Sequence, residues 1–129
     1  MWLAARGLDV VGCDVSPLAV DAACSAAAVL GLDEACRFVV ADLDEGLPDG
    51  PPVDVVICQR FRDPRLDAAL IERLVAGGVL AISALSQVGA QSTGRFHEPP
   101  GALVDAFGHL DVVASAEGDG VAWLVAKKP

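Results

Sequence analysis

The sequence lacks an apolar run long enough to cross a membrane, for which roughly 20 consecutive apolar residues are needed. Its first residues, Met1 to Gly7, have neither the basic start nor the long apolar core of a signal peptide. Low-complexity segments, linkers and internal repeats are missing too, and 53% of the 129 residues are hydrophobic. These absences predict one packed domain, residues 1–129, in the cytoplasm and away from membranes.

Basic residues are few. Nine Lys and Arg stand against 18 Asp and Glu, which gives a formal net charge of −9. Because nucleic acids are bound chiefly by Lys and Arg that neutralise phosphates, this balance argues against a nucleic-acid partner. A small molecule is the expected substrate.

The sequence also lacks the cysteine spacing of a zinc site. None of the four cysteines forms a C-x-x-C pair, and neither histidine lies near them, so no metal is expected. Three of the four lie in apolar runs and are expected to pack as small hydrophobic residues. Free thiols without a bridging pattern fit a reducing cytoplasm. The four are Cys13, Cys24, Cys36 and Cys58.

Strand and helix patterns alternate along the chain. Short apolar segments predict strands at residues 8–14, 37–42, 53–59 and 79–85. Ser16 and Pro17 supply the cap and first turn of an Ala-rich helix that ends at Gly31. The same cap-then-proline signal at 63–64 opens a second helix, which the glycine pair 77–78 ends.

The C-terminal third predicts a loop, a short helix and a hairpin. Residues 86–100 are rich in Gly, Ser, Gln and Pro, which indicates a mobile loop, and a short helix is expected at 100–107. Two apolar runs, 110–116 and 121–126, flank an Asp-Gly pair that is a strong hairpin signal. Strands alternating with helices predict an α/β fold with a parallel sheet covered on both faces and an antiparallel edge.

Two acids end successive predicted strands. In open α/β sheets ligands bind at the carboxyl ends of the strands, and Asp14 could accept hydrogen bonds from both hydroxyls of a ribose. The alternative is that Asp14 only caps the helix that follows. Asp42 ends the next strand, where an adenine amino group would lie if Asp14 holds the ribose. Nicotinamide-binding folds show the same pair of acids, so this class stays open.

Four segments carry a family resemblance. They are Asp14-Val15-Ser16-Pro17, Val40-Ala41-Asp42-Leu43, Val53-Asp54-Val55-Val56 and Leu74-Val75-Ala76-Gly77-Gly78-Val79-Leu80. Their order and spacing resemble the class I S-adenosylmethionine-dependent methyltransferases, whose last strand also inserts antiparallel. Within that class, residues 94–107 are similar to the group containing the tellurite-resistance methyltransferase. The resemblance covers essentially the whole chain.

The resemblance implies a Rossmann-like methyltransferase fold of three layers, with a mostly parallel sheet and an antiparallel C-terminal hairpin. It implies S-adenosylmethionine as cofactor and methyl transfer to a small-molecule acceptor. No general base is implied, because this transfer depends on in-line geometry and exclusion of water. The residues implied to bind the cofactor are Asp14, Val15, Asp42, Leu43 and Cys58.

The sequence departs from the family at two points. Ala76 stands where the family usually has Pro, which affects only a turn. Met1 to Arg6 resembles the tail of the family's first core helix, so the preceding central strand and its G-x-G-x-G loop are absent. That loop lets the backbone approach the methionine moiety, so we expect this truncated chain to be impaired. Without the central strand, the edges of the two strands that would flank it are exposed. These edges must pair with each other, with a second copy or with further residues.

Residues on two loops could contact the acceptor. Those after the third predicted strand would face the transferred methyl group, and those that flank Phe96 could form a lid. The alternatives are that Arg60 and Arg62 pair with Asp63 or Asp67 in a solvated loop, and that His97 is a surface histidine. The candidates for acceptor binding are Gln59, Arg60, Arg62, Arg95 and His97, beside Cys58.

Three functions therefore remain open. The first is methyl transfer, and the second is a non-catalytic remnant of the fold that binds a partner or forms an oligomer. The third, a nicotinamide-binding domain, is disfavoured by Asp42, by the glycine pair 77–78 and by the terminal hairpin.

Overall fold

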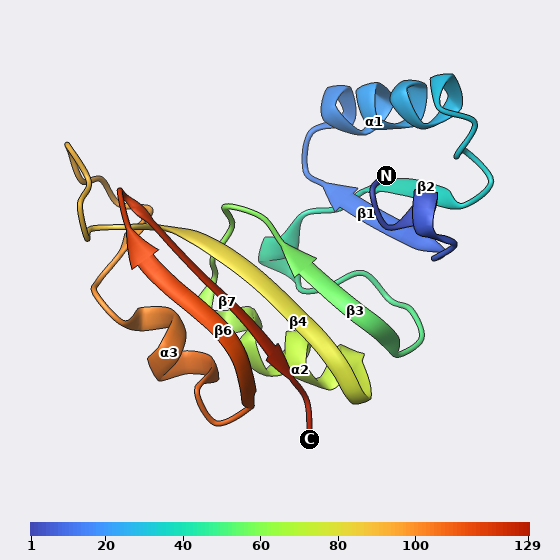
Figure 1. Cartoon of the computed structure of the whole chain (residues 1–129). Helices are drawn as coiled ribbons and strands as arrows, with labels where there is room; N and C mark the ends of the chain where they lie inside the picture. The colour runs from blue at the N-terminus through green and yellow to red at the C-terminus, as the bar shows by residue number, and fades with distance from the viewer. The chain divides into compact units, whose positions relative to one another are not determined.

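The computed structural model describes all 129 residues, which divide into two compact units, Met1–Pro48 and Asp49–Pro129 (Figure 1). Each unit is described by itself. The first contains a two-stranded sheet and the second a five-stranded sheet. The longest helix of the structure has 13 residues, short of the length that a membrane crossing requires.

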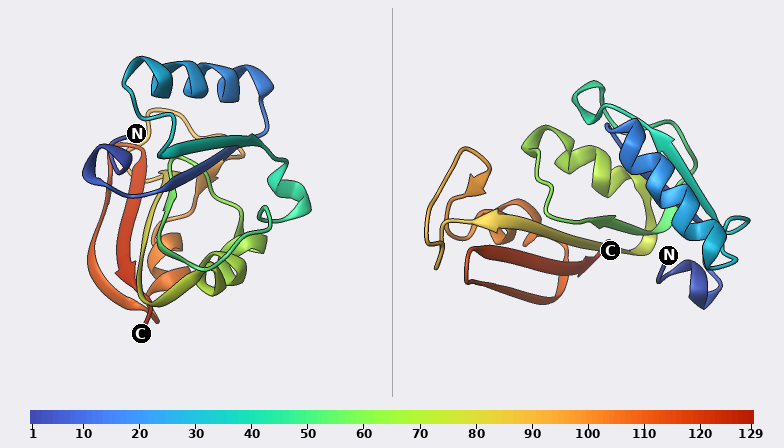
Figure 2. Two further views of the ribbon diagram at one scale, coloured as in Figure 1. Left: turned by 90° about the vertical axis from the view of Figure 1, so that its right-hand side faces the viewer. Right: turned by 90° about the horizontal axis from the view of Figure 1, so that it is seen from above.

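The first unit is a βαβ arrangement. Its elements are η1 (Ala4–Arg6), β1 (Val10–Asp14), α1 (Pro17–Val29), β2 (Cys36–Val40) and η2 (Leu43–Glu45). Strands β1 and β2 are parallel and α1 packs along them, as both views of Figure 2 show. Ala4, Ala27 and Cys36 form the small core, against which Phe38 packs.

Local sequence explains the limits of α1. Ser16 is the N-cap, and its hydroxyl accepts a hydrogen bond from the Ala19 amide at 3.3 Å. At the other end Gly31 adopts φ +65°, and the amide of Leu32 donates to the carbonyl of Ala27 at 2.9 Å. A left-handed glycine with this bond is a Schellman motif, so the predicted end of the helix is confirmed.

The second unit has a mixed sheet in the order β3-β4-β7-β6, with the short β5 also paired to β4. Strands β3 and β4 are parallel, whereas β7 is antiparallel to both β4 and β6. The strands are β3 (Val53–Cys58), β4 (Leu74–Ser86), β5 (His97–Glu98), β6 (Asp111–Gly118) and β7 (Val121–Lys127). The helices are η3 (Pro64–Leu66), α2 (Asp67–Arg73) and α3 (Ala102–Phe107).

The core of the second unit lies on one face of its sheet. Alternate residues of β4 and β7 are buried there with Leu103 and Phe107 of α3, because side chains alternate between the two faces of a strand. The opposite face carries Ile57, 53% exposed, and Trp123, 41% exposed. The buried strand residues are Leu80, Ile82, Ala84, Ala122, Leu124 and Ala126.

The hairpin of β6 and β7 forms as predicted. Asp119 has φ +51° and Gly120 has φ +79°, so both turn residues are left-handed. Two left-handed residues are the requirement of a type I′ turn, which an Asp-Gly pair meets at low cost. The hairpin is the antiparallel part that the sequence predicted.

The start of β4 differs from the prediction. The helix before it ends at Arg73, and the strand begins at Leu74 rather than at Val79. Gly77 has φ +77°, and its amide donates to the carbonyl of Lys128 at 2.8 Å. The glycine pair therefore forms a bend within a long strand and does not end the helix, because pairing with the C-terminal strand extends β4 backwards.

The expected single sheet is present as two sheets. Strand β1 pairs only with β2, and β3 pairs only with β4 on one side, so both are edge strands. Exposed backbone groups on such edges favour pairing with a further strand.

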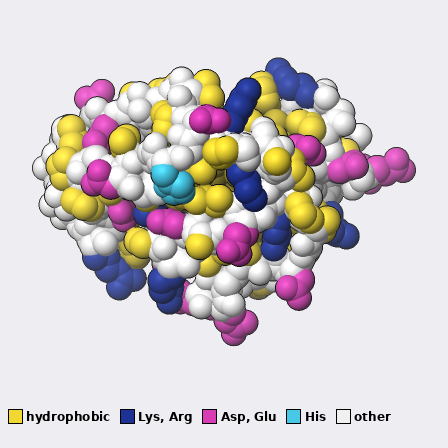
Figure 3. Space-filling model, turned by 90° about the horizontal axis from the view of Figure 1, so that it is seen from below, with side chains coloured by type: hydrophobic (Ala, Val, Ile, Leu, Met, Phe, Trp, Pro, Cys, Tyr) yellow, Lys and Arg dark blue, Asp and Glu magenta, His cyan; other side chains and the backbone are white.

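On the face of the molecule in Figure 3, acidic, basic and apolar side chains are interspersed.

Candidate functional site

Asp14 and Asp42 lie at the carboxyl ends of neighbouring parallel strands. Asp14, the last residue of β1, lies opposite Val40, the last residue of β2. The amide of Ala41 donates to the carbonyl of Asp14 at 3.0 Å, which continues the ladder to the residue before Asp42. The predicted position of the two acids on one edge of the sheet is confirmed.

Each of these carboxylates already accepts one backbone hydrogen bond. Oδ1 of Asp14 accepts from the amide of Ser16 at 2.8 Å, and Oδ1 of Asp42 accepts from the amide of Asp44 at 2.9 Å. Asp42 is thereby the N-cap of η2, whereas Asp14 binds the amide of Ser16, which is itself the N-cap of α1. Both acidic side chains are exposed, and the Oδ2 atom of each accepts no hydrogen bond in the structure, so these bonds leave an oxygen for a ligand hydroxyl or amino group.

A hollow of about 210 Å³ lies beside Asp14, between β1 and α1. Phe38 closes it below Gly12, where an added Cβ would lie 2.7 Å from the ring, so only glycine leaves room for the phenyl group. The hollow thus combines one carboxylate with apolar walls, and Val15, Asp42 and Leu43 are not part of its lining. It is lined by Gly12, Cys13, Asp14, Ala19, Val20, Ala23 and Phe38.

The apolar walls also affect Cys13. Its side chain is accessible, yet partial burial raises the pKa of the thiol, and the negative charge of Asp14 raises it further. Cys24 is exposed as well, whereas Cys36 is buried and Cys58 half-buried. The expectation that three of the four pack as buried residues is therefore wrong, because α1 and β1 turn Cys13 and Cys24 outward. The described residues form no cluster of three or more side chains that could hold a metal ion.

In the second unit, the segment after β3 begins with a strained turn. Arg60 has φ +52°, which is uncommon for a residue with a side chain, and its amide donates to Oγ of Ser83 at 2.9 Å. The side chains of Gln59 and Arg60 are exposed. Cys58 instead packs against the core of this unit.

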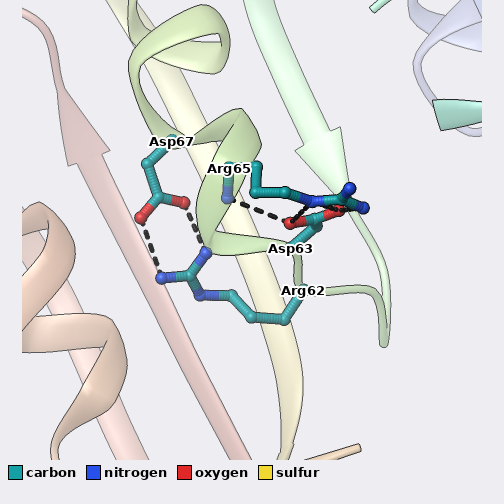
Figure 4. Close-up of polar contacts among 4 residues, drawn as sticks. All are labelled: Arg62, Asp63, Arg65 and Asp67. Atoms are coloured by element: carbon teal, nitrogen blue, oxygen red, sulfur yellow. Dashed lines mark hydrogen bonds and ion pairs between the residues drawn. The ribbon is translucent and has the colours of Figure 1, made fainter. Parts of the chain in front are cut away.

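Arg62 is turned into the protein (Figure 4). Its side chain is 6% exposed and binds the Asp67 carboxylate through both terminal nitrogens, with the second bond at 2.8 Å. The guanidinium also lies 5.5 Å from the centre of the Phe107 ring, and its buried Nε has no hydrogen-bond partner. Of the two acids that the sequence offered as partners, Arg62 pairs with Asp67. Because Arg62 is buried and Arg60 is exposed, the two side chains do not point to the same side.

A second ion pair in Figure 4 joins Arg65 and Asp63. Nε and a terminal nitrogen of Arg65 donate to the Asp63 carboxylate at 3.0 and 2.6 Å, and the Arg65 amide donates to it at 2.9 Å. These bonds lower the pKa of Asp63, and the side-chain bonds have a larger effect than the amide bond. The sequence signal of Asp63 before Pro64 predicted the cap but not this ion pair.

The loop that carries Arg95 and His97 is held at its base rather than free along its length. His97 is half-buried in β5, opposite Leu85, and its Nδ1 accepts from the amide of Gly94 at 3.0 Å. Arg95 is exposed and stacks over the ring of Phe96, 4.4 Å from its centre. Only the tip of the expected mobile loop therefore projects from the unit.

Sequence reasoning missed one polar network of this unit. Ser86 and Glu117, which are 31 residues apart, share a hydrogen bond of 2.6 Å. No local pattern could have indicated this pair, because the two residues meet only when β4, β7 and β6 are assembled.

The fold is that of the class I methyltransferases. No protein-family model matches the sequence, and no curated protein is significantly similar to it. Among solved structures, TehB from Haemophilus influenzae superposes with a TM-score of 0.82 at 15% identity, over 99% of this chain and 52% of that one. This chain thus spans about half the length of TehB.

Two further similar structures carry names that describe different reactions. Geranyl diphosphate C-methyltransferase from Streptomyces coelicolor A3(2), in complex with Mg²⁺, geranyl diphosphate and S-adenosyl-L-homocysteine, has a TM-score of 0.74 at 14% identity, over 100% of this chain and 66% of that one. The [4+2]-cyclase SpnF has a TM-score of 0.77 at 16% identity, over 95% and 66%. The resemblance drawn from the sequence is confirmed for the fold, and the fold by itself does not define the reaction.

Proposed function

We propose that the protein binds S-adenosylmethionine and takes part in methyl transfer to a small-molecule acceptor, and that this chain does so weakly. The observation that supports this most is the pair of carboxylates at the carboxyl ends of β1 and β2, each with an oxygen that accepts no hydrogen bond. A ribose diol and an adenine amino group are donors that suit such oxygens. The methyltransferase fold, found in a structure with bound S-adenosyl-L-homocysteine, agrees with this assignment.

The hollow beside Asp14 supports a ligand with an apolar part next to its hydroxyl groups. Phe38 and Val20 offer flat or apolar contacts, and Asp14 offers a hydrogen-bond acceptor. We assign the cofactor contacts to Asp14, Val15, Asp42 and Leu43. Cys58 stays a weaker candidate because it packs on the core of the second unit.

For the acceptor we retain Gln59, Arg60, Arg95 and His97, whose side chains are exposed or half-buried. Arg62 is a poorer candidate because Asp67 already binds it. A net charge of −9, with acidic groups dispersed among basic ones in Figure 3, supports a small acceptor over a nucleic acid. The four free thiols support a cytoplasmic location.

The test is a titration with S-adenosyl-L-homocysteine followed by amide chemical shifts, which report weak binding. We expect shifts at Asp14 and Ala41, and Asp14→Asn should weaken binding roughly 10- to 100-fold because one charge-assisted hydrogen bond is lost. Asp9→Asn is the matched control, since Asp9 is an exposed acid just before β1, at the opposite end of the strand. Equal binding by both variants would contradict the assignment of Asp14.

The alternative is a non-catalytic binding or oligomerisation module. The edge strands β1 and β3 favour it, because a second copy or another chain could pair with them. A folded chain whose amide shifts do not respond to millimolar S-adenosyl-L-homocysteine, and which sediments as an oligomer, would support this alternative.

A further inference from the structure

The two ends of the loop between β4 and α3 meet at one carboxylate. Ser86, the last residue of β4, is fully buried, and its hydroxyl donates to Oε1 of Glu117 at 2.6 Å. Oε2 of the same side chain accepts from the amide of Gly101, the residue before α3, at 3.0 Å. Glu117 on β6 therefore bridges the residue that precedes the loop and the residue that follows it.

Further hydrogen bonds hold the first arm of the loop. The Ser86 hydroxyl also accepts from the amide of Val88 at 3.0 Å, and the carbonyl of Val88 accepts from the amide of Gly120 at 2.8 Å. Gly89 lies so close to the hairpin that an added Cβ would be 2.7 Å from the Asp119 amide nitrogen. The first arm is thus packed on the turn between β6 and β7.

The second arm pairs with β4. His97 and Glu98 form the short strand β5 opposite Leu85 and Ser86, and the amide of Gln87 donates to the carbonyl of Glu98 at 3.0 Å. The tip at 91–96 has only the bonds between Gly94 and His97, so it is not attached to the sheet. The base of the loop is therefore hydrogen-bonded to β4 and to the hairpin, whereas its tip at 91–96 is not.

We propose that Glu117 is a clasp that closes the base of this loop and so positions the tip that carries Arg95. The buried Ser86 hydroxyl needs a partner, and the carboxylate provides it while also holding the start of α3. Glu117 acts through Ser86 and Gly101 and is a positioning residue. The proposal deepens the proposed function by assigning a mechanical role to the loop that would contact the acceptor, but it depends on no ligand.

The loop offers a direct probe, because Arg95 is the one Lys or Arg between Arg73 and Lys127. Tryptic cleavage after Arg95, identified by mass spectrometry, measures opening of the base, since the protease must bind residues on both sides of the cut. We expect Glu117→Ala to raise the initial rate of this cleavage about tenfold, as loss of charge-assisted hydrogen bonds predicts. Asp111→Ala, which removes another exposed carboxylate from the same strand, should leave the rate unchanged.

Hydrogen exchange separates a clasp from a local bond. If Glu117 closes the base, Glu117→Ala should speed exchange at the Gln87 amide, whose partner is Glu98, as well as at Gly101. Faster exchange at Gly101 alone, with cleavage after Arg95 unchanged, would overturn the proposal. If the alanine variant does not fold, Glu117→Gln should change both readouts in the same direction but less, because its amide oxygen can still accept one bond.

These outcomes are independent of the cofactor. A chain that fails to bind S-adenosyl-L-homocysteine but opens its loop on loss of Glu117 would contradict the proposed function and support the clasp. The reverse pattern would contradict only the clasp.

Discussion

The amide of Ala41 donates to the carbonyl of Asp14 at 3.0 Å, one residue past the last paired residue of β2. This bond holds the strand ends together and brings Asp42 to the same edge as Asp14. Asp14 is part of this ladder and Asp42 follows its last bond directly, so the backbones of the two acids are held close to each other by the ladder.

The first prediction concerns cofactor affinity. Without a glycine-rich loop, the chain keeps the contacts proposed for Asp14, Asp42 and Leu43 but lacks those to the methionine moiety. Losing two or three charge-assisted hydrogen bonds weakens binding roughly a thousandfold or more, so a micromolar site becomes millimolar. The chain alone should bind S-adenosyl-L-homocysteine weakly and show little turnover, as measured by calorimetry and methyl-transfer assays.

A chain extended at its N-terminus by a strand and a glycine-rich loop should regain both affinity and turnover in the same measurements. Micromolar binding by the 129-residue chain would show that other contacts replace the loop.

The second prediction concerns the Arg62–Asp67 pair. Asp67→Ala leaves the guanidinium of Arg62, 6% exposed, without its counter-charge, and should lower the free energy of unfolding by about 3–5 kcal/mol. Replacing both residues, as Arg62→Met with Asp67→Leu, should cost less than this single change. Urea unfolding measures both effects.

The control is Arg65→Ala, which breaks the ion pair between Asp63 and the 66% exposed side chain of Arg65 and should lower the free energy of unfolding much less than Asp67→Ala does. If Asp67→Ala and Arg65→Ala have equal effects, burial does not strengthen the first pair.

The third prediction concerns the reactivity of Cys13. Burial first and the charge of Asp14 second raise the pKa of this thiol, which lowers its thiolate fraction at neutral pH. Asp14→Asn removes the smaller cause, so alkylation of Cys13 by iodoacetamide should become modestly faster. The rate at Cys24, read from the same mass spectra, serves as the internal control and should not change.

The fourth prediction concerns Asp63. Its pKa should lie below the usual 3.8, chiefly because Arg65 donates to the carboxylate, and Arg65→Ala should raise it toward that value. Since the folded-state pKa is lowered, the stabilisation is present above the unfolded-state pKa and is lost as pH falls through the folded-state pKa. A carboxyl-detected NMR titration measures the shift, and an unchanged pKa in Arg65→Ala would refute the assigned cause.

Much of the fold could be predicted because its signals are local. The cap at Ser16, the left-handed Gly31 and the Asp119-Gly120 turn each act within a few residues, so the pattern alone placed these elements. Asp14 and Asp42 could also be predicted as neighbours, since parallel strands in a βαβ unit bring their carboxyl ends to one edge.

Other features were decided only by tertiary structure. The sequence offered Arg62 two acids, Asp63 and Asp67, and packing against Phe107 selected the buried one, while Arg65 took the other. The extension of β4 back to Leu74 depends on pairing with the C-terminus.

The sequence by itself determined the cap and end of α1, the hairpin turn and which acids lie at the strand ends, because those properties arise from neighbouring residues. Which side chains are buried, paired or left open was decided by contacts between segments far apart in the chain. The contact between Ser86 and Glu117 is such a case. The free energy of burying a hydroxyl or a charge depends on the partners that the fold brings to it, and no local pattern encodes them.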